Sequence, residues 1–384
     1  MYHRRVITLT RPEARAFLVA HLGLGSASFP NGALGVRALL DRLRCIQLDP
    51  LDPMGTNADL VALARVDGIA RGDVYRHLLP GHAFEHFAKE RCLLPASAFP
   101  WYRDQAAETP WWRLGDRLKR LPDGVVEAVL ADVHARGPAL ASDLVDHGAV
   151  ERIDWSGWRG TGKATAMALE VLWTRCQVVV CGREGNAKRF DVPKRALPGV
   201  AALPAGDFAS WAVGERAHAA GLLSRASGAQ WSMLSDVRIS PLIDAMLAAG
   251  RLDEVRVEGA SRTYLAPPGL RETAMAAYDD RMRILGPLDP LLWDRKLVKD
   301  AFGFDYIWEV YKPAEKRRFG WYVCPLLFRG ALVGRLEGRV RGDTLAVDRI
   351  WPENGVRLDE DALDLALERH ATACGVSAFT RPAL

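Results

Sequence analysis

The chain has 384 residues, of which 49% are hydrophobic and 26% charged, and its formal net charge is +4. This composition is typical of a globular protein of about two or three domains with an ample core. No apolar run approaches the roughly 20 residues of a membrane helix, and the N-terminus lacks the apolar core of a signal peptide. We therefore expect a cytoplasmic protein without a membrane partner.

The predicted elements begin with a helix that opens at Arg11. Thr10 suits the N-cap position, where its hydroxyl accepts a hydrogen bond from a free backbone N–H, and Pro12 fits the first helical turn. A second helix is predicted over residues 36–44. It leads directly into residues 45–51, where apolar and polar residues alternate.

Residues 45–51 contain the candidate catalytic residues, Gln47 and Asp49. Pro50 disfavours helical geometry at Asp49, so the segment should be extended. Alternate side chains of a strand share a face, which places Gln47 and Asp49 together and turns the apolar residues between them towards a core. A carboxylate beside a carboxamide can position a water molecule and stabilise a developing cation, as hydrolysis of a glycosidic bond requires.

A turn is the alternative interpretation of the same residues. The Asp-Pro pairs at residues 49–50 and 52–53 are typical turn starters, and an exposed Gln47 would then have no catalytic role. This segment alone favours the turn.

Two later stretches share one order of elements, three helices followed by a β-hairpin, which is the order of a winged helix-turn-helix module. A linker with prolines at 95, 100, 110 and 122 precedes them. In the first stretch we predict helices over residues 124–135, 142–145 and 163–175, and strands over 177–181 and 188–192. In the second we predict helices over residues 208–222, 227–235 and 240–249, and strands over 255–257 and 262–265. Winged modules also serve as protein-binding scaffolds, so this order alone does not fix the function.

From about residue 283 onward the pattern changes to that of β-strands. Alternation with a period of two predicts strands over residues 307–311, 320–328, 331–340 and 344–351, followed by a helix over 359–374. We therefore predict an α+β fold with tandem winged helix-turn-helix modules and a small C-terminal antiparallel β-barrel. The predicted domains are residues 1–120, 121–204, 205–282 and 283–384.

Two other patterns that often mark sites carry little weight here. The six cysteines form no C-x-x-C pair, which argues against a zinc cluster or a disulfide framework, and we expect neither metal nor cofactor. Residues 157–163 have the spacing of a phosphate-binding P-loop, but Ala164 stands where the magnesium-binding hydroxyl belongs. We predict instead a loop before a helix, from which Lys163 can meet a phosphate.

A basic and aromatic segment over residues 312–322 is a candidate for contact with nucleic acid. Lys316, Arg317 and Arg318 lie beside aromatic residues, a mixture that suits phosphates and stacked bases. The alternative is a solvated turn between two strands, which the segment alone favours.

Taken together, these residues resemble the YcaQ-type winged-helix DNA glycosylases, which include interstrand-crosslink repair enzymes and AlkZ-like relatives. The resemblance covers nearly the whole chain. Its motifs are Gln47-Leu48-Asp49, residues 84–90 with 93–95 and 101–103, and residues 287–295 with 302–306 and 316–322. The AlkZ-like branch carries a second Gln where this chain has Asp49, so the first motif matches the crosslink-repair branch.

The resemblance implies a monofunctional DNA glycosylase that hydrolyses the N-glycosidic bond of N7-alkylated purines and possesses neither metal nor cofactor. Asp49 would stabilise the oxocarbenium ion and activate water, and Gln47 would position that water. The partner would be double-stranded DNA carrying alkylated or crosslinked purines, bound by a monomer. The candidate DNA-contacting residues are Thr56, Asn57, His86, Lys89, Lys163, Lys316, Arg317 and Arg318.

Several assignments stay open at this point. A hydrogen-bonded, partly buried His86 is as compatible with the sequence as a DNA contact, and Asp289 and Asp294 are expected to cap turns. A non-enzymatic winged-helix regulator is the rival function, although regulators usually bind paired half-sites as two-fold dimers. An ATP-driven enzyme that uses residues 157–163 is a third and weaker alternative.

Overall fold

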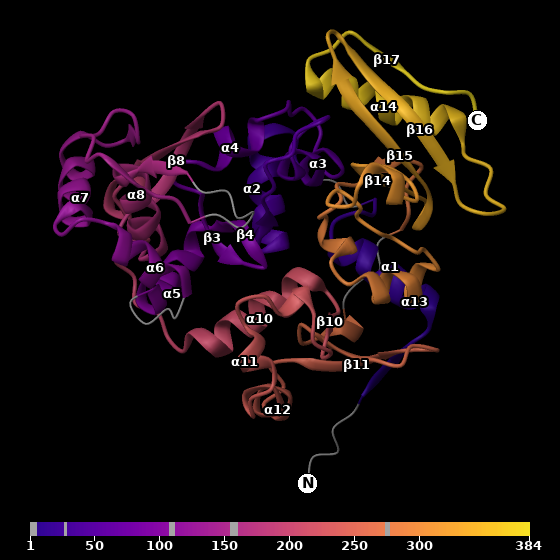
Figure 1. The fold of residues 1–384 in the computed structure, drawn as a ribbon. Helices are drawn as coiled ribbons and strands as arrows, with labels where there is room; N and C mark the ends of the chain where they lie inside the picture. Colours follow the sequence, from indigo (N-terminus) through magenta and orange to yellow (C-terminus); the bar gives the residue numbers. More distant parts are fainter. Residues whose placement is uncertain (1–5, 27–28, 107–111, 154–159, 273–276) are drawn as a thin grey trace. The chain divides into compact units, whose positions relative to one another are not determined.

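The structure is a computed structural model that describes residues 6–26, 29–106, 112–153, 160–272 and 277–384 (Figure 1). The chain divides into two compact units. The first unit comprises Met1–Val74, Phe87–Cys92 and Ala209–Leu384, and the second comprises Tyr75–His86 and Leu93–Phe208. Among the described helices, none combines the length and the apolar character needed to span a membrane.

The first helix begins where the sequence predicts. α1 covers Arg11–His21, and the Thr10 hydroxyl accepts a hydrogen bond from the backbone N–H of Glu13. The Glu13 carboxylate accepts one in return from the backbone N–H of Thr10, at 2.7 Å. These reciprocal bonds form a capping box, which satisfies backbone groups that the helix leaves free.

α2 delivers the chain to the candidate motif. It covers Gly32–Leu43 and ends at Arg44, whose left-handed backbone (φ 62°) turns the chain into β2, a strand of two residues over Ile46–Gln47. The Leu48 N–H still donates to the Arg91 carbonyl at 2.8 Å, so extended pairing continues one residue beyond β2. The prediction of an extended segment is confirmed up to that residue.

A buried β-hairpin follows where the sequence predicts a linker, and that prediction is wrong. β3 covers Ala83–Ala88 and β4 covers Glu90–Pro95, and the strand order of the sheet is β2-β4-β3. Side chains on both faces of this hairpin are buried over residues 83–86 and 92–95. Strands buried on both faces show no alternation of apolar and polar residues, which removes the signal of a strand.

The N-terminal strand belongs to a sheet that forms far along the chain. β1, over Ile7–Leu9, pairs in parallel with β11, over Asp253–Val257. The sheet order is β1-β11-β12-β10, with β12 at Thr263–Ala266 and β10 at Leu223–Ser224. The predicted hairpin of β11 and β12 is confirmed, whereas the pairing with β1 leaves no local sequence pattern.

Two of the three helices predicted in this stretch form, as α10 over Phe208–Ala220 and α12 over Leu242–Ala248. The helix predicted over residues 227–235 is wrong. The chain there makes only a 3-10 turn at Ala229–Trp231, and the short α11, Ser235–Arg238, begins at the end of the predicted range. The Trp231 indole N–H donates to the Ser224 carbonyl at 2.7 Å, a side-chain bond that holds the turn.

The second unit contains helices followed by a β-hairpin, an arrangement similar to that of α10, α12 and the hairpin of β11 and β12. Its sheet has the order β5-β9-β8, and β6 pairs with β7 in a separate antiparallel pair. The main helices are α5 (Phe99–Ala106), α6 (Trp112–Arg120), α7 (Val125–Arg136) and α8 (Ala164–Thr174). The strands are β5 (Ala139–Leu140), β6 (Ala149–Glu151), β7 (Thr161–Lys163), β8 (Val179–Glu184) and β9 (Ala187–Asp191).

The helix predicted over residues 142–145 is wrong, because side chains occupy the backbone groups that a helix would use. The Val145 N–H donates to Asp132 Oδ2 at 2.8 Å, and the Val145 carbonyl accepts from Thr165 Oγ1 at 2.7 Å. Such bonds offer the backbone an alternative to helix. Both stretches therefore have the outer helices and the hairpin but no continuous middle helix, and the winged helix-turn-helix assignment stays a prediction.

The C-terminal part of the first unit is a five-stranded sheet covered by a helix. Its order is β13-β14-β15-β16-β17, and no pairing of β13 with β17 closes it within the described residues, so the predicted barrel is an open sheet. The strands are β13 (Arg283–Ile284), β14 (Val323–Phe328), β15 (Ala331–Arg341), β16 (Thr344–Pro352) and β17 (Ala378–Thr380). α14, over Glu360–Cys374, lies against the sheet (Figure 1), where Leu363 and Leu367 share a core with Leu326 and Leu336.

The strand predicted over residues 307–311 is wrong. The Glu309 carboxylate accepts hydrogen bonds from the backbone N–H groups of Arg318 and Phe319, at 3.0 and 2.9 Å. These bonds fold the segment back on itself as a loop. The remaining predicted strands and the C-terminal helix are confirmed, and the Asp359 side chain caps α14 by accepting from the Ala362 N–H.

A buried ion pair joins the N-terminal helices to the segment before α13 (Arg295–Phe302). The Arg65 guanidinium donates to both oxygens of Asp289, at 2.7 and 3.0 Å, and both side chains are fully buried. Asp289 also accepts from the backbone N–H of Leu291, which confirms its predicted role as a cap. The pair therefore fixes residues 286–294 against the end of α3 (Asn57–Leu63).

Asp289→Asn should lower the free energy of unfolding by about 3–5 kcal/mol, because it leaves the Arg65 charge buried without its counterion. Urea denaturation measures the loss. Asp280→Asn is the matched control, since Asp280 pairs with Arg329 at 2.6 Å but the two side chains are 80% and 60% exposed. Equal losses in the two variants would show that the buried pair does not anchor the fold.

Candidate functional site

Gln47 is held at the end of β2 by bonds to its backbone and to its side chain. Its exposed fraction is 6%, so the predicted alternation, with Gln47 turned away from the core, is only partly met. The Gln47 carbonyl accepts a hydrogen bond from Asn57 Nδ2 at 2.8 Å, and Gln47 Oε1 accepts one from Lys89 Nζ at 2.8 Å. The carboxamide is therefore a fixed group and not a mobile surface side chain.

The orientation of the Gln47 carboxamide follows from its partner. An ammonium group has three donors and no acceptor, so the amide oxygen must face Lys89. The two N–H groups of the amide then point away from Lys89. With its oxygen turned to Lys89, the amide can offer only its N–H donors to a further partner.

Lys89 is itself buried, with an exposed fraction of 5%. Its Nζ lies 5.3 Å from the ring centre of Trp293, whose indole N–H donates to the Leu288 carbonyl at 3.0 Å. Burial lowers the pKa of Lys89 from its ordinary value of 10.5; Cys92 and Glu90 oppose this shift, while the charge of Arg216 adds to it. The sequence places Lys89 among DNA contacts, whereas the structure places it against Gln47.

Asp49 lies two residues beyond Gln47 and is half-buried. Its Oδ1 accepts a hydrogen bond from the Leu51 N–H at 2.9 Å, which forms the local turn that the Asp49-Pro50 pair favours. The extended segment and the turn are therefore both present, one after the other. Burial raises the pKa of Asp49 above its ordinary value of 3.8, while the bond from Leu51 opposes this rise.

In addition to burial, the Asp49 charge raises the pKa of Tyr322. Tyr322 is almost fully buried, and its pKa is raised by burial and further by the neighbouring groups, Asp49 and Asp52 among them. Asp49 is therefore close to Tyr322, the residue that precedes β14 of the C-terminal sheet.

Thr56 and Asn57 have structural roles in this conformation. The Thr56 hydroxyl accepts from the Asp59 N–H in the capping box of α3, and it also donates to Asp59 Oδ2 at 2.8 Å. Asn57 is fully buried, and its Oδ1 accepts from the Leu288 N–H at 3.1 Å while its Nδ2 donates to Gln47. Asn57 thus bridges the candidate motif and the loop held by Asp289, which favours a positioning role over contact with DNA.

His86 belongs to an aromatic cluster of the second unit. Its ring centre lies 4.9 Å from that of Tyr102 and 5.1 Å from that of Trp173, and its Nε2 lies 3.2 Å from the Thr174 carbonyl. The neighbouring Glu85 is buried and pairs with Arg183. These contacts match the alternative in which His86 is a hydrogen-bonded, buried residue.

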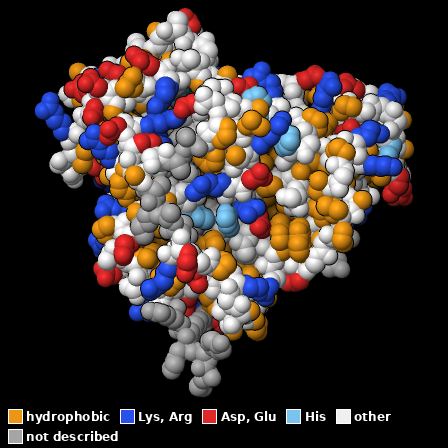
Figure 2. Space-filling model, turned by 180° about the vertical axis from the view of Figure 1, so that it is seen from behind, with side chains coloured by type: hydrophobic (Ala, Val, Ile, Leu, Met, Phe, Trp, Pro, Cys, Tyr) orange, Lys and Arg blue, Asp and Glu red, His pale blue; other side chains and the backbone are white. Residues whose placement is uncertain are grey.

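The remaining predicted DNA contacts are cationic and largely solvent-accessible. Lys316 and Arg318 are exposed, and Arg317 is partly exposed with its Nε donating to the Lys312 carbonyl at 2.8 Å. Lys163 pairs with Asp146 at 3.1 Å at the start of α8. On the face shown in Figure 2, basic and acidic side chains are interspersed.

The loop with P-loop spacing falls partly outside the described residues. Its last residues, Thr161–Lys163, form β7 and pair with β6, so this part is a strand and not a phosphate cradle. No group of three or more His, Cys, Asp or Glu side chains suited to a metal occurs within the described parts of the chain.

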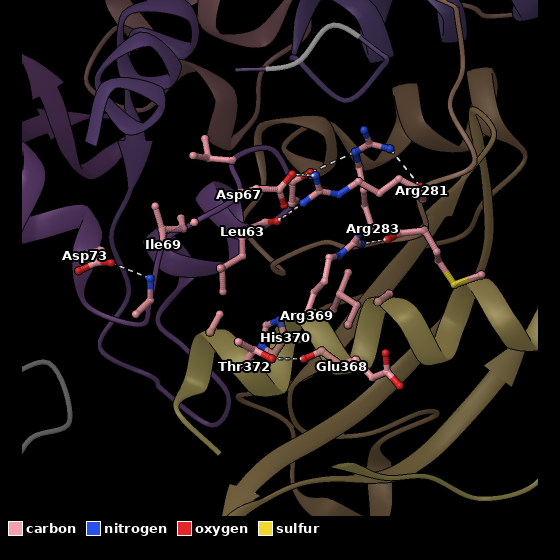
Figure 3. A pocket seen from close by; sticks show the side chains of 18 residues that line it. Leu63, Asp67, Ile69, Asp73, Arg281, Arg283, Glu368, Arg369, His370 and Thr372 are labelled. Carbon is pink, nitrogen blue, oxygen red and sulfur yellow. Dashed lines mark hydrogen bonds and ion pairs between the residues drawn. The ribbon is translucent and has the colours of Figure 1, made fainter. Parts of the chain in front are cut away.

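A cavity of about 600 Å³ in the first unit is lined by residues of the segment after α3, of β13 and of α14 (Figure 3). Arg281, Arg283 and Arg369 extend to it, together with Asp67 and Glu368. Arg281 pairs with Asp67 at 2.7 Å. Neither Gln47 nor Asp49 lines this cavity, so its size does not mark the candidate catalytic site.

Comparisons with known proteins give one family and one fold. The family model described as DNA glycosylase AlkZ-like matches residues 40–373. The structure resembles that of Streptomyces sahachiroi DNA glycosylase AlkZ with a TM-score of 0.59, over 97% of this chain and 99% of that chain. Sequence identity is 19%, so this likeness concerns the fold. Both findings agree with the resemblance seen in the motifs.

Asn57→Leu should lower the free energy of unfolding by about 2–4 kcal/mol, because the Gln47 carbonyl and the Leu288 N–H would lose their partner. Urea denaturation gives the loss, with Thr56→Ala as the comparison for removal of a cap alone, about 1 kcal/mol. A DNA-contact role would instead leave stability unchanged and weaken binding to undamaged duplex.

Proposed function

Because the chain belongs to the AlkZ-like DNA glycosylase family, we propose that it hydrolyses the N-glycosidic bond of N7-alkylated purines in double-stranded DNA, with Asp49 and Gln47 as catalytic residues. The observation that carries this proposal is the Gln47-Leu48-Asp49 motif. It combines a clamped carboxamide with a half-buried carboxylate two residues away. Opening of interstrand crosslinks joined through purine N7 is the same reaction on a larger lesion.

The Asp49 carboxylate stabilises the positive charge that develops on the sugar. Alkylation at N7 makes the base cationic and a good leaving group, so the remaining need is to stabilise the sugar as it acquires oxocarbenium character. An ionised Asp49 about 4 Å from that cation would contribute about 4 kcal/mol at an effective dielectric constant near 20. This amount corresponds to a rate factor of about a thousand.

Gln47 holds the attacking water, and Asp49 accepts its proton. The amide oxygen of Gln47 faces Lys89, so its N–H groups can hold the oxygen of the attacking water. Water oxygen bonds to C1′, the bond from C1′ to the purine nitrogen breaks, and the base leaves with the bonding electrons as a neutral alkylpurine. The proton of the water passes to Asp49.

The exposed cations suit contact with the DNA backbone. Lys316 and Arg318 in the first unit and Lys163 in the second are the candidates for phosphate contacts, which position a duplex without reading its sequence. We propose that the protein acts as a monomer on one damaged duplex. A stable dimer that protects one specific sequence, without base release, would favour the transcriptional regulator instead.

Asp49→Asn should reduce base release from an oligonucleotide with a single N7-methylguanine by about a thousandfold, because the amide cannot stabilise the cation by charge. Abasic sites are detected by strand cleavage in alkali. Asp52→Asn is the matched control: Asp52 is a nearby exposed carboxylate that accepts from the Gly55 N–H and pairs with Arg71. Unchanged release in Asp49→Asn, or loss in Asp52→Asn alone, would place the catalytic carboxylate elsewhere.

The rate of base release should fall at acidic pH, because Asp49 acts in its ionised form. Burial raises its pKa, so the fall should be centred above 3.8, with activity present above that pKa and lost below it. Single-turnover rates between pH 4 and 8, corrected for release without enzyme, give the profile. In Asp49→Asn this acidic limb should be absent, and an identical limb in both proteins would assign it to another group.

A further inference from the structure

The hydrogen-bond partner of Lys89 is unusual for a buried cation. The residue is 5% exposed, and its ammonium donates at 2.8 Å to Gln47 Oε1, a neutral oxygen, instead of to a carboxylate. Burying a charge is costly unless the surrounding groups compensate for it. The groups that compensate here are the carboxamide oxygen and the face of the Trp293 ring at 5.3 Å, and the charge of the neighbouring Glu90 also favours the protonated form.

We propose that Lys89 is a positioning residue for base release, which holds the Gln47 carboxamide in the one orientation that presents its N–H groups to the attacking water. This inference rests on the proposed function and extends it to a residue outside the motif. Lys89 acts through Gln47 and touches neither water nor the sugar.

Two further contacts make this arrangement rigid. Asn57 Nδ2 holds the Gln47 carbonyl at 2.8 Å, so the Gln47 backbone cannot shift to relax the side chain. The indole N–H of Trp293 is bonded to the Leu288 carbonyl at 3.0 Å, which fixes the ring beside the Lys89 ammonium. A side chain with three rotatable bonds is thereby held near one rotamer before substrate binds, and that preorganisation raises the reaction rate.

Contact of Lys89 with a DNA phosphate is the competing role, and burial argues against it. A phosphate contact needs an ammonium that solvent and DNA can reach. Lys316 and Arg318 are exposed in this way, whereas Lys89 is enclosed between Gln47 and Trp293.

A double-mutant cycle separates the two roles. Single-turnover release of N7-methylguanine is measured for wild type, Lys89→Met, Gln47→Ala and the double variant, with affinity for undamaged duplex measured in parallel. Lys89→Met should slow release by roughly ten- to a hundredfold in the wild-type background, the worth of a hydrogen bond to a charged group. In the Gln47→Ala background it should slow release by less than about twofold, because its target is gone.

Two comparisons complete the test. Lys89→Arg keeps a cation but changes its shape, so it should recover part of the rate that Lys89→Met loses. If circular dichroism shows that Lys89→Met does not fold, the same cycle is carried out with Lys89→Arg. Lys316→Met serves as the phosphate-contact control, with weaker binding to undamaged duplex and a shallower salt dependence.

Equal losses for Lys89→Met in both backgrounds, or weakened binding to undamaged duplex like that of Lys316→Met, would overturn the positioning role and leave the proposed function intact. Absence of release by the wild type would overturn the proposed function and, with it, this inference.

Discussion

The ion pair between Arg65 and Asp289 fixes the surroundings of the candidate site. Both side chains are fully buried, and Asp289 sits in the loop that also supplies the Leu288 N–H to Asn57 and the Trp293 ring to Lys89. The loop approaches Asn57 so closely that a Cβ on Gly286 would lie 2.7 Å from Asn57 Oδ1. Asn57 and Lys89 in turn hold the backbone and the side chain of Gln47. A buried ion pair is by itself weak evidence of stability. This pair matters because it fixes the position of the loop that contacts Asn57 and Lys89.

The two proposed catalytic groups are held in different ways that suit their tasks. Gln47 is buried and clamped, as a group that positions a molecule by hydrogen bonds must be. Asp49 is half-buried, so its charge can reach a substrate while remaining less screened than on an open surface. One carboxylate suffices for the proposed reaction because an N7-alkylated purine leaves without strong acid catalysis. Ordinary glycoside hydrolysis, in contrast, uses a pair of carboxyl groups.

Local patterns in the sequence predicted the elements that depend on local bonds. Thr10 caps α1 and Asp359 caps α14, and the strands β15 and β16 follow the predicted alternation. The hairpin of β3 and β4 was missed because both of its faces are buried. The helix predicted over residues 142–145 is absent where Asp132 and Thr165 bond to the Val145 backbone, and a pattern within residues 142–145 cannot show these partners.

In the candidate site, too, local sequence patterns predict some features, whereas others depend on tertiary contacts. Spacing and resemblance identify Gln47 and Asp49, and their segment is extended up to Leu48, after which Asp49 begins a turn. Asn57 and Lys89 were singled out as DNA contacts, and only their tertiary contacts reveal that they hold Gln47. Trp293 lies within a motif of the family resemblance but gave no sign of its contact with Lys89. A sequence pattern marks such residues as notable without showing what they touch.

In the proposed mechanism the Asp49 charge faces the cationic sugar. The decisive measurement is the affinity for duplexes that carry, at one position, either a cationic azaribose or the neutral tetrahydrofuran of the same shape. Wild type should bind the cationic sugar more tightly by about tenfold or more, and Asp49→Asn should lose that preference while it binds the neutral duplex equally well. The same preference in wild type and Asp49→Asn would show that Asp49 does not face the sugar.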